Sequence, residues 1–132
     1  MTTPTTLLLH PRLRLPCRAG AIVMYLAIIT IGNIPGARAD IGTVAPGPVL
    51  HSLAYAVLAA LWFVGSPGTA VTRAVKAVLT VAVMGACDET IQSFFPYRGA
   101  SVRDWAVDVA AAIVASVVLY RLTPRGAAAT KH

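Results

Sequence analysis

Hydrophobic residues dominate four stretches of the chain, and residues that disfavour helix continuation bound most of them. The first stretch ends in Asn33, Pro35 and Gly36, and the third stops before Pro96. Pro48 opens the second stretch, where a proline is favourable because the first helical residues need no backbone N–H partner. The four stretches cover roughly residues 19–34, 48–65, 71–95 and 103–120.

Each stretch is long enough to cross a lipid bilayer as a helix. Roughly 16 to 25 helical residues are available in each, against the ~20 that a hydrocarbon core of ~30 Å requires. A water-soluble bundle would need a polar face on every helix, which these stretches mostly lack. Lys76 lies near one end of the third stretch, so its charged group can reach the interface. The pattern predicts an all-α integral membrane protein, a four-helix transmembrane bundle.

Composition supports lipid as the solvent of this chain. The 132 residues are 57% hydrophobic and 12% charged, half the charged fraction of about a quarter that is usual in soluble domains. The net charge of +6 could indicate nucleic acid as a partner, but the basic residues occur in small groups between apolar runs and form no single stripe. We therefore expect membrane lipids as partners and no nucleic acid.

The basic residues also orient the predicted bundle. Four spans place both termini on one side, and eight of the eleven Lys and Arg residues fall on that side. By the positive-inside rule both termini are predicted to be cytoplasmic. The predicted divisions are a cytoplasmic tail at 1–18, a membrane domain at 19–121 and a cytoplasmic tail at 122–132. The eight residues are Arg12, Arg14, Arg18, Arg73, Lys76, Arg121, Arg125 and Lys131, and the other three are Arg38, Arg98 and Arg103.

Four of the five acidic residues of the chain gather within residues 84–108. An unpaired carboxylate in hydrocarbon costs a few kcal/mol even on permissive scales, so something must compensate these charges. The third helix ends, and the second and fourth begin, on the same predicted outer side, where further polar residues join them. A functional polar pocket is favoured over a purely structural network. The candidate pocket residues are His51, Tyr55, Asp88, Glu89, Gln92, Arg98, Asp104 and Asp108.

Several of these residues also have a structural interpretation. Ser101-Val-Arg-Asp104 matches a capping box, which favours a structural role for Asp104. Arg98 follows a Pro-Tyr pair and can serve as a loop charge that meets lipid headgroups. His51 and Tyr55 can instead anchor their helix at the membrane interface. Gln92 can instead make a hydrogen bond between helices.

The same residues carry a resemblance to a family. The stretches LHSLAYAVLA with His51, DETIQSFFPYR with Glu89 and Arg98, and SVRDWAVD with Asp104 follow one another in order on the predicted spans. Over roughly residues 20–120 the sequence resembles the VanZ-like membrane proteins. Their pattern has a His opening the second helix, an acidic-Glu-x-x-Gln motif ending the third, then an Arg and an Asp. The chain departs from that pattern in Gly47-Pro48, where Asp-Lys is usual, and in Asp108, where Asn is usual.

The resemblance implies a role in the cell envelope, in the bacterial plasma membrane, with low-level resistance to teicoplanin-type glycopeptides in some members. It implies no established reaction, so whether the chain is an enzyme stays open, and its cofactor is unknown. The sequence lacks a P-loop, an HExxH motif and a GxSxG elbow. We expect an outward-facing pocket that binds a lipid or peptidoglycan-precursor headgroup.

Two alternatives stay open at this stage. One is an intramembrane enzyme that acts on a polyprenyl-phosphate carrier, with a divalent cation held by Asp88, Glu89 and Asp108. The other is a small proton-coupled transporter, because buried carboxylates serve as proton relays in such proteins.

Overall fold

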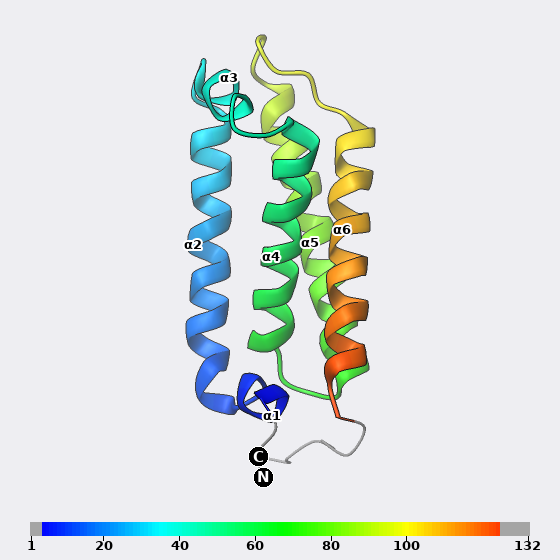
Figure 1. Cartoon of the computed structure of the whole chain (residues 1–132). Coiled ribbons are helices and arrows are strands. Elements are labelled where there is room, and N and C mark those ends of the chain that lie inside the picture. Colours follow the sequence, from blue (N-terminus) through cyan, green and yellow to red (C-terminus); the bar gives the residue numbers. More distant parts are fainter. Residues whose placement is uncertain (1–3, 125–132) are drawn as a thin grey trace.

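The computed structural model describes residues 4–124, and that part of the chain is built from helices and connections without a strand. Consecutive long helices run antiparallel to one another, which confirms the predicted all-α four-helix bundle (Figure 1). The elements are α1 (Pro4–Leu8), the 3₁₀ turn η1 (Pro11–Leu13), α2 (Arg14–Gly32), α3 (Ala37–Gly42), α4 (Gly47–Gly65), α5 (Ala70–Ser93) and α6 (Val102–Leu122).

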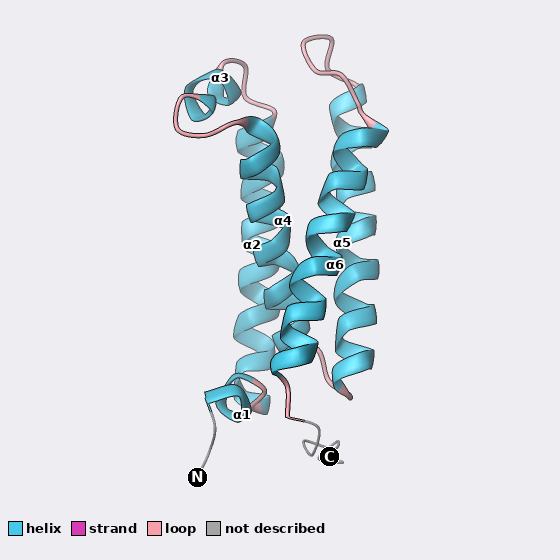
Figure 2. Ribbon diagram, turned by 45° about the vertical axis from the view of Figure 1, so that its right-hand side comes forward, coloured by secondary structure: helices cyan, strands magenta, loops and turns pink. Residues whose placement is uncertain are grey.

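All four long helices have the length and composition that crossing a bilayer requires. The spans contain 22, 19, 24 and 21 residues, the first of them joining η1 to α2, against the ~20 needed. The chain is therefore a multi-pass membrane protein. We call the end with the α4–α5 turn and the start of α2 the lower end. The end with α3 and the α5–α6 loop is the upper end (Figures 1 and 2).

The first long helix begins earlier than its hydropathy indicates. Residues 14–18, predicted to belong to a tail, form the first turn of α2, and residues 4–8 and 11–13 are also helical. Pro16 does not prevent this start, because a proline in the first turn lacks only an N–H that would have no partner there. Arg14 and Arg18 lower the hydropathy without opposing helix formation. The predicted tail at 122–132 lies mostly outside the described residues.

The α4–α5 connection is short and closely packed. Gly68 has a φ of 112°, in the left-handed region that favours glycine. Thr69 then caps α5, because its hydroxyl accepts a hydrogen bond from the backbone N–H of Thr72 at 3.2 Å. This turn sets α4 and α5 side by side, so that residues from both can meet α6.

Helix α6 packs against α4 and α5, and α2 packs against α4. Apart from Tyr55, the buried core is made of small and medium side chains, namely Ala21 of α2, Leu58 and Ala59 of α4, and Val81 of α5. Helix α6 contributes Ala112 to it. Small side chains at such contacts let helix backbones approach closely, which is how helices associate where lipid removes the hydrophobic driving force.

Helix α6 has three pairs of small residues four positions apart, Ala106/Ala110, Ala111/Ala115 and Ala112/Ser116, and the last pair faces the bundle. Both are buried, whereas Ala106 and Ala110 are exposed. Replacing Ala112 by Leu should lower the free energy of unfolding by about 1–3 kcal/mol, because the larger side chain overpacks the contact. Thermal unfolding in detergent measures this. The matched control is Ala110→Leu, and equal melting temperatures for the two variants would contradict the assigned face.

Candidate functional site

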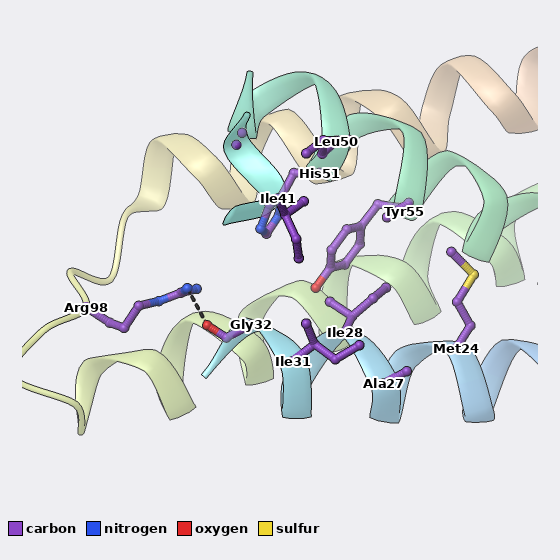
Figure 3. Close-up of a pocket in the computed structure, with 13 residues that line it drawn as sticks. Met24, Ala27, Ile28, Ile31, Gly32, Ile41, Leu50, His51, Tyr55 and Arg98 are labelled. Atoms are coloured by element: carbon purple, nitrogen blue, oxygen red, sulfur yellow. Dashed lines mark hydrogen bonds between the residues drawn. The ribbon is translucent and has the colours of Figure 1, made fainter. Parts of the chain in front are cut away.

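A cavity of about 290 Å³ lies between α2 and α4 near the upper end. Its walls are mostly apolar, with side chains of α2 on one side and of α4 on the other, and Ile41 of α3 closing part of it (Figure 3). The volume is close to the lower limit of ≈300–1,000 Å³ usual for small-molecule pockets. The lining residues are Met24, Ala27, Ile28, Ile31, Gly32, Ile41, Gly42, Gly47, Leu50, His51, Ala54, Tyr55 and Arg98.

Tyr55 connects the cavity to a buried carboxylate of α5. Its ring is fully buried, and its hydroxyl donates a hydrogen bond to Oδ2 of Asp88 at 3.1 Å. Asp88 itself is 2% exposed. The phenol thus satisfies one oxygen of a carboxylate that water cannot reach, and it does so from the neighbouring helix.

His51 makes the same kind of link to α6. Its Nδ1 lies 3.4 Å from Oδ1 of Asp108, which is long for a hydrogen bond. The imidazole also stacks on the ring of Tyr55, with centroids 5.8 Å apart and planes at 10°. Asp108 is 1% exposed, and its Oδ2 has no hydrogen-bond partner among the described residues. That oxygen lies near Gly85 of α5, where an added Cβ would stand 3.6 Å from it.

Glu89 holds the beginning of α6 and does not line the cavity. Its Oε2 accepts a hydrogen bond from the backbone N–H of Ser101 at 2.7 Å. The Ser101 hydroxyl in turn accepts the N–H of Asp104 at 3.3 Å. The predicted capping box is therefore half right, because the bond to the capping N–H comes from Glu89 of another helix and not from Asp104. A carboxylate is favourable at this position since a helix N-terminus carries partial positive charge.

Arg98 holds the end of α2 from the α5–α6 loop. Its Nη1 donates a hydrogen bond to the carbonyl oxygen of Gly32 (Figure 3). The hydroxyl of Tyr97 donates to the carbonyl oxygen of Asn33 at 2.8 Å. These carbonyls belong to the last turn of a helix and have no partner within it. Arg98 also lines the cavity, so it combines a structural bond with a charge at the cavity edge.

The eight predicted residues therefore do not form one pocket. Three line the cavity, namely His51, Tyr55 and Arg98. Asp108 lies behind His51, and Asp88 lies behind Tyr55. The remaining three, Glu89, Gln92 and Asp104, do not line it: Glu89 caps α6, Gln92 is 3% exposed on the buried face of α5, and Asp104 borders a second space of about 30 Å³ beside Pro48 and His51. Depth along each helix was predictable, but the rotation of one helix against another was not.

The carboxylates do not gather as metal ligands. Within residues 4–124 no group of three or more His, Cys, Asp or Glu side chains could hold a metal ion. Asp88 is directed to Tyr55, Glu89 to the N–H of Ser101, and Asp108 to His51. The ligand set that the metal-dependent alternative needs is thus not formed by these three residues.

Two aromatic residues that sequence reasoning missed bind the backbone of α5. The indole Nε1–H of Trp105 donates to the carbonyl oxygen of Ala82 at 2.9 Å, and the hydroxyl of Tyr25 donates to that of Met84 at 2.7 Å. Gly85 allows the first contact, because a Cβ there would lie 3.1 Å from Cδ1 of Trp105. The available signal was the polar end of each aromatic ring, which needs a partner when it is buried.

No family model, curated protein or solved structure matches the chain. The resemblance to the VanZ-like family stays a prediction that rests on the sequence motifs.

Replacing Glu89 by Ala should lower the free energy of unfolding by about 2 kcal/mol, because a buried, charge-assisted bond to the N–H of Ser101, the residue that caps α6, is lost. Asp104→Ala should cost less than about 1 kcal/mol, the usual size of a helix-dipole contribution. Denaturation of both variants in mixed micelles gives the two values. A larger loss for Asp104→Ala would restore the conventional capping box and contradict the role of Glu89.

Proposed function

We propose that this chain is a multi-pass protein of the bacterial plasma membrane that binds a lipid or a lipid-linked envelope precursor in the cavity between α2 and α4. The observation that carries the proposal is the cavity itself, apolar along both helices and polar only at His51, Tyr55 and Arg98. Such a distribution suits an amphiphile, whose hydrocarbon part fills the apolar walls while its headgroup meets the polar side chains.

The chemistry of the polar end supports a headgroup with both anionic and hydrogen-bonding groups. Arg98 is the residue type suited to phosphate or carboxylate, because its planar fork can bind two oxygens at once. His51 stands 22% exposed, with Asp108 behind it. A hydroxyl or amide of a bound headgroup would find hydrogen-bonding partners in this part of the cavity.

The wider biological role comes from the sequence resemblance. VanZ-like proteins act in the cell envelope, and some give low-level resistance to teicoplanin-type glycopeptides. We propose the same setting for this chain, with the cavity facing outward and both termini in the cytoplasm. The basic residues support this orientation, since eight of the eleven belong to the side of the termini.

A bound lipid can be detected directly. Native mass spectrometry of the protein released from bacterial membranes should show a retained lipid on the unmodified chain. Ala54→Leu fills part of the cavity and should reduce the retained fraction roughly tenfold, because one misplaced apolar group in a filled pocket costs 1–3 kcal/mol. Ala110→Leu, an equal change on an exposed face of α6, should retain the lipid. Equal retention by both variants would contradict binding in this cavity.

The orientation is tested by reporter fusions. Alkaline phosphatase fused at the C-terminal end should be inactive, because that enzyme folds only in the oxidising periplasm. The same reporter inserted at residues 43–46 of the upper connection should be active. An active C-terminal fusion would place the cavity in the cytoplasmic leaflet.

A further inference from the structure

Four cations surround the lower end of α4. Arg73, which is 5% exposed, donates from Nε to the carbonyl oxygen of Gly68 at 3.0 Å and from Nη1 to that of Val64 at 3.2 Å. Lys76 donates to the carbonyl oxygen of Pro67 at 3.3 Å. Both come from α5. Arg73 binds a carbonyl of the last turn of α4 as well as one of the connection that follows, and Lys76 binds another carbonyl of that connection, close to the negative end of the α4 dipole. Two more, Arg14 and Arg18 of α2, complete the group, which we call the basic collar.

Arg14 and Arg18 lie against the same end of α4. Gly65 permits this approach, because an added Cβ there would stand 2.8 Å from Cγ of Arg18 and 3.1 Å from the carbonyl oxygen of Arg14. The guanidinium of Arg18 lies over the ring of Trp62, 5.6 Å from its centroid. This contact fixes the direction of the side chain and attracts the cation to the ring face.

The charges of the collar repel one another. Arg14 and Arg18 are one helical turn apart, where like charges destabilise a helix. Arg14 also lies within electrostatic reach of Arg73. The Nε atoms of Arg14 and Arg18 are buried and have no hydrogen-bond partner among the described residues. A buried donor without a partner is costly, and so is a group of like charges in a membrane protein.

No Asp or Glu side chain lies at this end. The acidic residues of the chain are all at the opposite end, one in α3 and the others in the upper parts of α5 and α6. They are Asp40, Asp88, Glu89, Asp104 and Asp108, and these are the five that the whole sequence contains. No acidic side chain therefore compensates the collar, and an anion bound from outside the chain can do so.

We propose that the basic collar binds the phosphate of an anionic phospholipid headgroup, with Arg14 and Arg18 in contact and Arg73 and Lys76 adding charge behind them. The collar lies at the ends of spans of suitable length, the depth at which headgroup phosphates occur. Basic pockets between transmembrane helices are suited to such headgroups, and arginine pairs bidentately with phosphate. This site lies at the other end of the bundle from the cavity and does not depend on the proposed function.

The test measures thermal stability of the purified full chain in a neutral detergent with three additions at equal concentration. These are phosphatidylglycerol, phosphatidylcholine and inorganic phosphate. We expect phosphatidylglycerol alone to raise the melting temperature clearly. If inorganic phosphate raises the melting temperature as much as phosphatidylglycerol does, the collar binds a free anion. If phosphatidylcholine raises it as much, binding does not depend on the charge of the lipid. Either result overturns the proposal.

Variants locate the effect. Each arginine near the surface contributes roughly fivefold to affinity for anionic lipid, so Arg14→Gln with Arg18→Gln should weaken phosphatidylglycerol binding roughly 25-fold. The matched control is Arg12→Gln with Arg121→Gln, which removes the same charge from exposed positions at the same end. An equal loss in the two double variants would show non-specific attraction and overturn the assigned site.

A second readout remains informative if the Arg14 and Arg18 double variant does not fold. Native mass spectrometry of the Ala54→Leu variant, whose cavity is partly filled, in an equimolar mixture of phosphatidylglycerol and phosphatidylcholine should show phosphatidylglycerol adducts in excess. Equal adducts of the two lipids would overturn the proposal without any change in the collar.

Discussion

The packing of α4 depends on two carboxylates that have no access to water. Asp88 on α5 and Asp108 on α6 are almost fully buried, and an uncompensated carboxylate in such a place is costly. Both find their partners on α4, where Tyr55 and His51 stand one turn apart with stacked rings. This arrangement fixes the rotation of α4 against its two neighbours. Because this face of α4 meets α5 and α6, Leu50 and Ala54 of the same helix are turned toward α2, and the cavity forms between α2 and α4.

Several of the other charged side chains bind backbone groups at helix ends. Lipid offers no hydrogen bonds, so the backbone groups at the end of each helix need partners from the protein or the interface. Glu89 of α5 serves the start of α6, Arg98 of the α5–α6 loop serves the end of α2, and Arg73 of α5 serves the end of α4. In each case the side chain comes from outside the helix it caps and has the sign that the helix dipole favours. Charged residues that look functional in the sequence are thus partly structural.

The sequence was sufficient for the four helices and the end at which the polar residues gather, because hydropathy and breaking residues act locally. The sequence did not predict which side chains of different helices contact one another. Positions 88, 89 and 92 share one helical face, yet Asp88 points to α4 and Glu89 to α6, since the face is wide enough to meet two neighbours. The start at Arg14 was missed because charge lowers hydropathy without opposing a helix. Helix α3, which closes the cavity through Ile41, is too short to leave a periodic pattern.

The two ends of the bundle differ in their electrostatics, and this separates what each can bind. At the upper end Arg98 and His51 have the buried carboxylates Asp88 and Asp108 close behind the cavity, so positive charge there is offset within the protein. At the lower end no Asp or Glu side chain offsets the collar. A simple anion is therefore attracted more strongly to the lower end. The lining of the cavity, apolar except at His51, Tyr55 and Arg98, instead supports the proposed amphiphilic ligand, whose recognition would depend on shape and donor placement more than on net charge.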